Sequence, residues 1–277
     1  MKEIDVARIV DGMLVREGAG VKLKRYIGAD RSNDWEPVLL FDYFDSEEPM
    51  DYLGGFPAHP HRGFETITYM LAGKMMHQDN QGHQGIIGPG DVQWMTAGRG
   101  VVHSEMPAQN HGRLAGIQLW LNLPADNKMV TPAYQEYTAE QLPIEQQDSG
   151  TTIKVIAGST AQGTHSPISG IATAPLMFDI QMRLPSTITQ SIPESHQAMV
   201  LVLDGVLSIQ DNTIPAGNLA MLTTGDSLTF KALTSDTRCL LIAAKKLHEP
   251  IARLGPFVMN TQAEIMQAMD DFRNHRF

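Results

Sequence analysis

Two short motifs in the first half of the chain carry the residue types that bind a divalent metal ion. His59 and His61 are separated by one residue, and so are His103 and Glu105. Side chains two positions apart on a β-strand point to the same face of the sheet, so each motif can present two ligand atoms to one point. Three imidazoles and one carboxylate suit Fe(II), Mn(II), Ni(II) or Cu(II) more than a structural zinc ion, which usually recruits cysteine. A six-coordinate ion would keep two positions for water, oxygen or a chelating substrate, so the motifs indicate an open, catalytic type of metal site.

Short β-strands are the elements that would position these motifs. Apolar runs such as TITYMLAG (66–73), LAGIQLWLNLP (114–124) and AMVLVLDGVLSIQ (198–210) are separated by Gly, Pro, Asp and Asn. Regularly spaced short strands with turn residues between them are typical of an all-β sandwich or barrel. The sequence therefore predicts an all-β fold.

Helical periodicity is confined to the C-terminal end of the sequence. Thr261 and Glu264 have the spacing of a capping box. The apolar side chains that follow recur on one helical face, and they are Ile265, Met266, Met269 and Phe272. We therefore expect one short helix that begins near Thr261.

The two halves of the chain have related patterns. Residues 70–80 (MLAGKMMHQDN) align with residues 202–212 (VLDGVLSIQDN), and residues 87–91 (IGPGD) resemble residues 214–218 (IPAGN). In each half, an apolar strand turns at Gly and a second Gly-containing turn follows before another apolar strand. The positions that this comparison pairs with the four candidate ligands carry neither histidine nor carboxylate in the second half. We therefore expect one metal site, in the first half, and a second half without metal.

The composition is that of a globular protein with an acidic balance. The 277 residues are 42% hydrophobic and 19% charged, and the formal net charge is -10. This balance argues against direct nucleic-acid binding, which depends on Lys and Arg to replace phosphate counterions. The short basic segment KLKR (22–25) has alternating spacing and is interpreted as an exposed strand face.

Cysteine content and hydropathy bear on the compartment. Cys239, within RCLLIAA, is the only cysteine, so no intrachain disulfide can form and a buried strand thiol is expected. The chain shows no signal peptide, and no run reaches the roughly 18 apolar residues of a membrane span. We therefore expect a soluble protein of a reducing compartment, cytoplasmic by default and without membrane association.

Longer segments around the metal motifs make a family resemblance specific. FPAHPHRGFETITYMLAG (56–73) and PGDVQWMTAGRGVVHSEMP (89–107) resemble the pirin family. The resemblance extends over nearly the whole chain, more loosely in its second half, and includes GAGVKLKRYIG (18–28), LLFDYF (39–44) and EPIARLGPFVMNT (249–261).

The resemblance implies a bicupin, with two facing cupin domains that are each a small jelly-roll β-barrel. The boundaries that we expect are residues 1–130 for the metal-containing cupin domain and 131–150 for a linker. Residues 151–277 would form the second cupin domain together with the C-terminal helix. We also expect a monomer.

In pirins, the histidines of HPH and the histidine and glutamate of HxE bind the metal. These positions correspond here to His59, His61, His103 and Glu105. The family metal is usually taken to be iron, so the resemblance implies one divalent ion, Fe(II) first, with Mn, Ni, Cu, Co or Zn as alternatives. Glu65 stands where other cupins have a glutamate after the HxH motif. It either orients a histidine or bound water beyond the ligands, or is an exposed or ion-paired strand residue.

Some pirins show quercetin 2,3-dioxygenase activity, and the resemblance suggests the same activity here. The substrates would be a flavonol-like molecule and O2, and opening of the heterocyclic ring would release carbon monoxide. Glu105, or the nearby Glu65, is the candidate catalytic base.

Two other readings of the metal site stay open. The first is a metal-containing regulatory protein that binds a protein partner. Pirins have such roles in nuclear transcription in animals, where the location would be nuclear, and on metabolic enzymes in bacteria. The second is a structural metal in an inert pair of barrels. An open coordination position favours the dioxygenase or the regulator, because structural sites are normally closed by protein atoms.

Four further side chains are candidates for the surroundings of the metal. His77 and His83 lie between the two motifs, where a turn at a barrel rim is expected, so they would line an entrance or belong to the surface. Gln118 and Trp120 alternate on a predicted strand and are candidates to point into a cavity.

Overall fold

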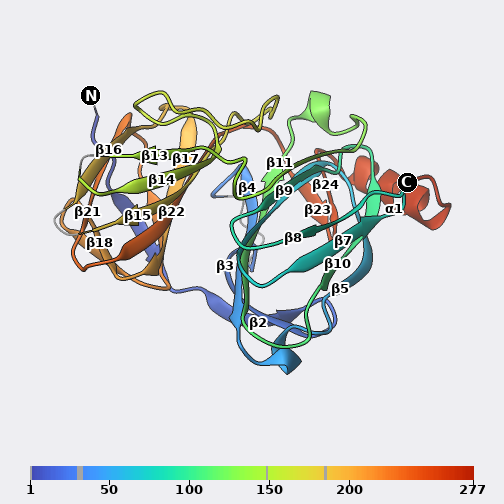
Figure 1. Ribbon diagram of the computed structural model, residues 1–277. Helices are drawn as coiled ribbons and strands as arrows, with labels where there is room; N and C mark the ends of the chain where they lie inside the picture. Colours follow the sequence, from blue (N-terminus) through green and yellow to red (C-terminus); the bar gives the residue numbers. More distant parts are fainter. Residues whose placement is uncertain (1, 30–33, 148, 184–185) are drawn as a thin grey trace. The chain divides into compact units, whose positions relative to one another are not determined.

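The computed structural model describes residues 2–29, 34–147, 149–183 and 186–277. Within these residues strands dominate, and the one α-helix is α1 (Gln262–Arg273), near the C-terminus (Figure 1). The chain forms two compact units. We call Met13–Ala139 with Leu247–Phe277 the first unit, and Met1–Gly12 with Glu140–Lys246 the second unit.

The first unit contains a seven-stranded sheet and a four-stranded sheet, both antiparallel. The seven-stranded sheet has the order β12 (Ala133–Tyr137), β9 (Val92–Thr96), β6 (Phe64–Ala72), β11 (Leu114–Asn122), β4 (Val38–Ser46), β3 (Val21–Ile27) and β2 (Met13–Glu17). The four-stranded sheet has the order β5 (Phe56–His61), β10 (Val101–Pro107), β7 (Met75–Asp79) and β8 (Gln84–Ile87). Two short 3-10 helices, η1 (Pro49–Asp51) and η2 (Ala125–Asn127), lie in its connections.

The second unit repeats this arrangement with other strands. Its seven-stranded sheet has the order β1 (Val6–Val10), β20 (Leu219–Leu222), β17 (His196–Asp204), β22 (Thr237–Lys245), β15 (Leu176–Met182), β14 (Thr152–Ala157) and β13 (Ile144–Gln146). Its four-stranded sheet has the order β16 (Thr187–Ser191), β21 (Ser227–Ala232), β18 (Val206–Ile209) and β19 (Asn212–Pro215). The matching strand orders confirm the relation between the two halves that the sequence predicted.

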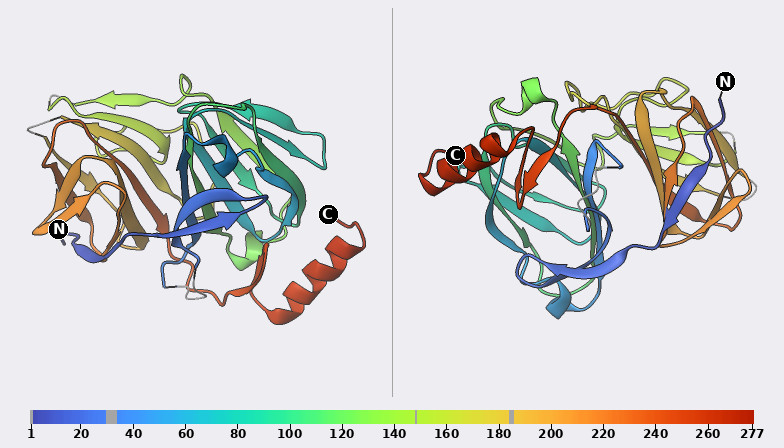
Figure 2. Two further views of the ribbon diagram at one scale, coloured as in Figure 1. Left: turned by 90° about the horizontal axis from the view of Figure 1, so that it is seen from below. Right: turned by 180° about the vertical axis from the view of Figure 1, so that it is seen from behind.

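The units divide the chain differently from the boundaries expected from the sequence. Residues 131–150, expected as a linker, contribute β12 to the first unit and β13 to the second, and Asp148 lies outside the described residues. Residues 247–277, expected with the second cupin domain, belong to the first unit, where β23 (Ala252–Leu254) and β24 (Phe257–Met259) contact α1 (Figure 2). The physical reason is specific contact, including an ion pair between Asp271 of α1 and Arg62.

Helix α1 begins where the sequence predicts. Thr261 Oγ1 accepts a hydrogen bond from the Glu264 backbone at 3.2 Å, and Glu264 Oε2 accepts one from the Thr261 backbone at 2.8 Å. Ile265 and Ala268 are buried. Met266, expected on the apolar face, is 60% exposed, because one residue turns an α-helix by about 100° away from that face.

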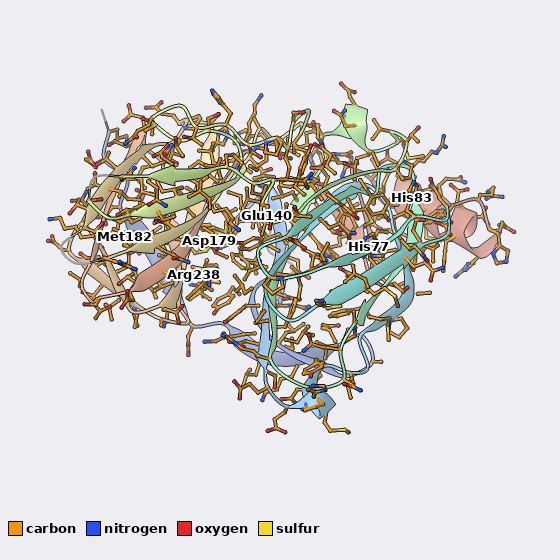
Figure 3. The ribbon with its side chains drawn as sticks, viewed as in Figure 1. His77, His83, Glu140, Asp179, Met182 and Arg238 are labelled. Atoms are coloured by element: carbon orange, nitrogen blue, oxygen red, sulfur yellow. The ribbon has the colours of Figure 1, made fainter. Side chains whose placement is uncertain are left out.

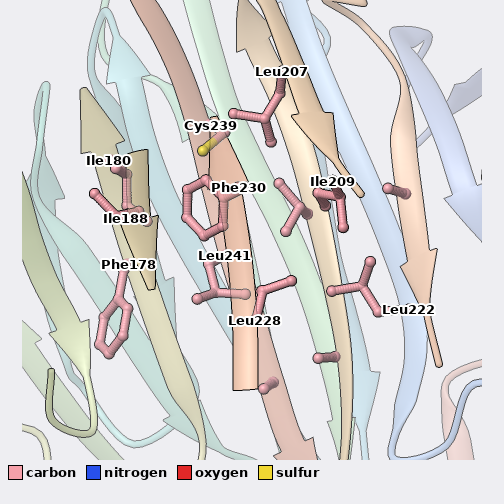
Figure 4. Close-up of a cluster of buried hydrophobic side chains, with 14 of the residues drawn as sticks. Phe178, Ile180, Ile188, Leu207, Ile209, Leu222, Leu228, Phe230, Cys239 and Leu241 are labelled. Carbon is pink, nitrogen blue, oxygen red and sulfur yellow. The ribbon is translucent and has the colours of Figure 1, made fainter. Parts of the chain in front are cut away.

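The interior of the second unit is a hydrophobic core (Figure 4). Phe230 on β21 lies opposite Ile188 on β16, and both are buried. Cys239 on β22 is fully buried in the same cluster, which confirms the predicted strand thiol. No helix of the described residues is long and apolar enough to cross a membrane.

Candidate metal centre

Strands β5 and β10 bring three histidines together in the four-stranded sheet of the first unit. In the antiparallel β5–β10 pair, His103 lies directly opposite His59, and Val101 lies opposite His61. His59 and His61 are two residues apart, so both can face the side of the sheet that carries His103. Pairing between the two strands therefore assembles the motifs that the sequence separates.

The distances between the three imidazoles suit a shared ion. His59, His61 and His103 each offer a ligand atom within 4.8 Å of the others, and the Nε2 atoms of His59 and His103 are 3.1 Å apart. Two nitrogens at right angles around one ion, each about 2.1 Å from it, would lie about 3.0 Å apart. The three-histidine group could therefore hold a metal ion.

A hydrogen bond sets the tautomer of His59. Its Nδ1 lies 2.8 Å from the carbonyl oxygen of Pro57. A carbonyl can only accept, so Nδ1 carries the proton and the Nε2 of the neutral ring keeps its lone pair. Backbone carbonyls commonly orient metal-binding histidines in this way.

Burial keeps the other two rings neutral. His61 and His103 are each 2% exposed. Burial, and then the neighbouring His103 and His59, lower the pKa of His61 well below its usual value. Burial is also the first cause that lowers the pKa of His103, to about 3. His61 and His103 thus offer uncharged imidazoles at neutral pH, the form that binds metals.

Glu105 lies on β10 beside the three histidines but is not part of the group within 4.8 Å. The pairing of β10 with β5 shifts between His103 and Glu105. In this structure the Glu105 carboxylate accepts a hydrogen bond from Thr68 Oγ1 at 2.9 Å. Burial raises the pKa of Glu105, and the neighbouring His59 and the hydrogen bond with Thr68 oppose that rise. The carboxylate is therefore close to the group and held by Thr68.

Glu65 is buried within the seven-stranded sheet. It is 2% exposed, and its Oε1 accepts a hydrogen bond from Thr96 Oγ1 at 2.7 Å. It forms no ion pair with any residue that the structure describes. Glu65 is therefore neither exposed nor ion-paired, which excludes the second of the two roles considered for it from the sequence. Burial raises the pKa of Glu65 to about 7.

A cavity of about 450 Å³ opens beside the histidines. His59, His61 and Glu105 line it, and its apolar wall is formed by Leu23, Leu40, Phe44, Phe56 and Trp120. The ring centroids of Trp120 and His61 are 5.2 Å apart. Gln118 and Trp120 both line the cavity, which confirms that this strand directs them inward.

His77 and His83 do not line this cavity. His77, on β7, is buried with its Nε2 2.8 Å from Glu136 Oε1. His83 is an exposed side chain beyond the β7 strand, 2.9 Å from Asp79 Oδ2 (Figure 3). The entrance role considered for these two histidines therefore does not fit their positions, and a surface position fits His83 alone.

The sequence did not reveal the charged wall of the cavity. Arg25, expected on an exposed strand face, lines it and donates two hydrogen bonds to Asp42, at 2.8 and 2.7 Å. Arg253, from β23, also lines it. The inward position of Arg25 follows from the alternation along β3, where Leu23 is buried on the same face. A local sequence pattern carries no signal for Arg253, because β23 reaches the cavity from the far end of the chain.

Comparison with known proteins agrees with this geometry. Residues 20–121 match the pirin family, and residues 177–277 match the pirin C-terminal cupin domain. The chain is 46% identical to a pirin-like protein of Caulobacter vibrioides, over 98% of each chain. The chain belongs to the pirin family.

Solved structures of the family share the fold. A crystal structure of a quercetin 2,3-dioxygenase from Acinetobacter baumannii is 34% identical, with a TM-score of 0.91 over 99% of this chain and 98% of that chain. The Escherichia coli pirin YhhW, crystallised in complex with nickel(II), matches at 19% identity and a TM-score of 0.63, over 89% of this chain and all of that one. The predicted fold, two pirin cupin domains with a short C-terminal helix, is confirmed.

Proposed function

We propose that this pirin-family chain is a metal-dependent dioxygenase that opens the heterocyclic ring of quercetin-type flavonols with O2 and releases carbon monoxide. The observation that carries the proposal is that His59 and His61 of the three-histidine group line a cavity of about 450 Å³ with aromatic walls. A cavity of this size and lining suits a flat aromatic ligand. The likeness to the Acinetobacter baumannii quercetin 2,3-dioxygenase supports the same choice.

The metal ligands that we propose are His59, His61, His103 and Glu105, and Fe(II) is the first choice of ion. The neutral imidazoles and the 3.1 Å separation of the His59 and His103 Nε2 atoms fit a divalent ion. Glu105 would turn from Thr68 toward the group on binding. A divalent ion would supply Lewis acidity that favours ionisation of the flavonol 3-hydroxyl group and a site for reaction with O2.

Glu105 is the proposed acceptor of the 3-hydroxyl proton. It lines the cavity, and its raised pKa makes it a better base than an exposed carboxylate. Thr68 Oγ1 lies 2.9 Å from Glu105 Oε1 and 2.8 Å from the Gln118 side-chain oxygen. A hydroxyl has one proton to donate, so when Glu105 is ionised and accepts it, the Gln118 amide would turn to present its NH2 group to Thr68. A chain from Gln118 through Thr68 would then orient Glu105 when it is turned away from the metal and acts as the base.

Glu65 is the second proposed base, and its position ranks it behind Glu105. It does not line the cavity, although a pKa of about 7 leaves its carboxyl half protonated at neutral pH. Replacing Glu105 by Gln should therefore reduce turnover far more than replacing Glu65 by Gln. Quercetin turnover at equal metal content distinguishes the two roles.

Oxygen uptake with quercetin tests the proposed function directly. Protein purified without oxygen and loaded with Fe(II) should consume O2 and release carbon monoxide in step. The His61→Ala variant should do neither, and the His83→Ala variant, which changes an exposed histidine of the same unit, should match the wild type. Fully metallated wild-type protein without uptake would contradict the dioxygenase and support a metal-containing regulator of a protein partner.

A further inference from the structure

Two arginines line the cavity beside the three histidines, and they differ in how their charges are balanced. Arg25 donates to both carboxylate oxygens of Asp42, and its Nη1 donates to Glu17 Oε1 at 2.7 Å. Two acidic side chains therefore occupy the guanidinium of Arg25. Arg25 is therefore part of the cavity wall, and its positive charge is already balanced by these two carboxylates rather than by a ligand.

Arg253 has no such partner. Its Nη1 donates to the Leu39 carbonyl oxygen at 3.0 Å, and it forms no ion pair with any residue in the described part of the chain. Burial, and then repulsion from Arg25, lower the pKa of Arg253, with Asp42 opposing. A partly buried guanidinium without a carboxylate contact gains most from an anionic ligand, because most of its five N–H donors are available for it.

Trp120 connects this guanidinium to the candidate metal centre. The Arg253 Cζ atom lies 5.1 Å from the centroid of the Trp120 ring. On the metal side, the Trp120 and His61 ring centroids are 5.2 Å apart. Both the cation and the histidine thus lie against the Trp120 ring, and all three side chains line the same cavity. A ligand that reaches both groups would lie along the Trp120 ring, and an aromatic ligand gains most from that contact.

We propose that Arg253 determines which ligands this cavity accepts: aromatic oxyanions that present a pair of oxygens to the histidine group and an ionised oxygen at the other end to the Arg253 guanidinium. The proposal rests on the proposed function for the oxygen pair at the histidines. It adds that the ligand must carry a charge at the end away from the histidines, a requirement that the histidines themselves cannot impose. The ionised oxygen is a phenolate in a polyhydroxylated flavonol or a carboxylate in an aromatic acid.

Two pairs of ligands test the requirement for a charged far end, with calorimetric binding to the whole Ni(II)-loaded protein. Quercetin and 3-hydroxyflavone share the 3-hydroxyl and 4-carbonyl oxygens, and only quercetin has hydroxyls on its other rings. Likewise, 3,4-dihydroxybenzoate differs from catechol by one carboxylate. The wild-type protein should bind the better-charged member of at least one pair about tenfold more tightly, the strength of one charge-assisted hydrogen bond. Which pair shows the preference identifies phenolate or carboxylate, and equal affinity within both pairs would overturn the proposal without any variant.

The Arg253→Gln variant assigns the preference to this residue. It should lose the roughly tenfold preference by weakening the charged member alone, with nickel content unchanged. Arg253→Lys should keep part of the preference, because lysine retains the positive charge but lacks the planar, paired N–H donors of arginine. Arg113→Gln is the matched control, since Arg113 is an exposed arginine of the same unit that pairs with Asp45 at 2.8 Å. A preference that survives in Arg253→Gln, or that Arg113→Gln also abolishes, would contradict the assignment.

The outcomes separate this inference from the proposed function. Loss of the preference in Arg253→Gln, without carbon monoxide release from quercetin in the Fe(II) protein, would leave the role of Arg253 standing and reject the dioxygenase. Carbon monoxide release with an unchanged preference in Arg253→Gln would keep the dioxygenase and reject the role of Arg253.

Discussion

The three histidines show how far single residues could be predicted. Their i, i+2 spacing was enough to choose His59, His61 and His103, because the alternation of a strand is local. The structure adds that β5 and β10 are neighbours, which places His59 opposite His103. Arg253 could not be chosen in this way. Its position depends on packing between segments far apart in the sequence, and such contacts leave no local pattern.

Removal of one imidazole should separate metal binding from folding. His61→Ala should lose tight Ni(II) binding, because a pair of histidines replaces the group of three, and should keep the β-rich fold. Metal analysis after gel filtration and circular dichroism measure the two effects. His196→Ala is the control, because His196 lies in the second unit with its Nε2 2.8 Å from the Ala174 carbonyl oxygen. The metal content of this variant should equal that of the wild type. Unfolding of His61→Ala would favour a structural metal.

The buried carboxyl of Glu65 should make the stability of the metal-free protein depend on pH. Its pKa is raised from 4.5 to about 7, so the folded state binds more protons than the unfolded state between these values. Stability should therefore fall as pH rises from about 5 to 8, by roughly 1–3 kcal/mol. In Glu65→Gln this fall should be smaller, as urea unfolding at each pH would show. The exposed Glu48→Gln should keep the wild-type slope, and an unchanged slope in Glu65→Gln would contradict the assignment.

At the scale of elements, the tail of β23, β24 and α1 supports the turn that follows the HPH motif. The Lys128 ammonium is buried and donates to the Gly63 carbonyl at 2.8 Å and to the Val258 carbonyl at 3.0 Å. Arg62 donates to Asp271 at 2.7 Å. The sequence predicted the helix correctly from its capping box but not its docking, because an amphipathic pattern shows that a face is covered without showing what covers it.

Neighbouring aspartates of α1 allow a test of this docking. Asp271→Asn should destabilise the protein by roughly 2 kcal/mol, because Arg62, which is 3% exposed on its side chain, would lose its carboxylate partner. The adjacent Asp270 pairs with Arg276 and is 58% exposed, so Asp270→Asn should change stability little. Urea unfolding at neutral pH compares the two, and equal effects would reject a docking role for the Arg62 contact.

The same aspartate predicts a change at acid pH. Arg62 holds the pKa of Asp271 at about 2, below its usual 3.8. The stabilisation is therefore present above pH 4 and lost as pH falls toward 2. The wild-type protein and Asp271→Asn should accordingly converge in stability over that range, and a constant difference would contradict the pairing.

The close approach between the HPH turn and the tail can be tested with glycines. Gly63 has φ +87°, and an added Cβ would lie 2.0 Å from the Val258 carbonyl oxygen. Gly82 has a similar φ of +91°, with nothing within 4 Å of such an atom. Gly82→Ala should thus cost about 1 kcal/mol from backbone strain alone. Gly63→Ala should cost at least twice as much and weaken Ni(II) binding. Similar losses of stability in the two variants would mean that the backbone at Val258 shifts easily to make room for the added Cβ.

At the scale of the whole molecule, two units of one topology have different interiors. In the first, β5 and β10 place histidines opposite each other. In the second, β16 and β21 place Ile188 opposite Phe230. The repeat was visible in the sequence because turns at Gly73 and Gly205 follow similar apolar strands, and both glycines have positive φ. The unit boundaries were not visible, since pairing of β1 with β20 joins residues more than two hundred positions apart.

Metal binding should therefore be confined to the first unit. Phe230→Ala should lower the melting temperature, because loss of a buried phenyl group costs about 3–5 kcal/mol. Added Ni(II) should still bind with wild-type affinity, because the substitution leaves the residues that would hold the ion unchanged. Calorimetry measures both effects, and loss of Ni(II) binding in this variant would show that the units are coupled.

Each unit includes a terminal segment that is distant in sequence from the rest of that unit, and this limits how the chain can be divided into separately expressed parts. The first unit takes residues 247–277, and the second takes residues 1–12. A polypeptide that stops at the middle of the chain would lack the Val258 carbonyl and the Asp271 carboxylate that support the barrel with the three histidines. A polypeptide that starts there would lack strand β1 and leave the edge of β20 open to aggregation. A rearranged chain in which residue 277 is linked to residue 13, and residue 246 to residues 1–12, would instead carry each unit as one uninterrupted stretch.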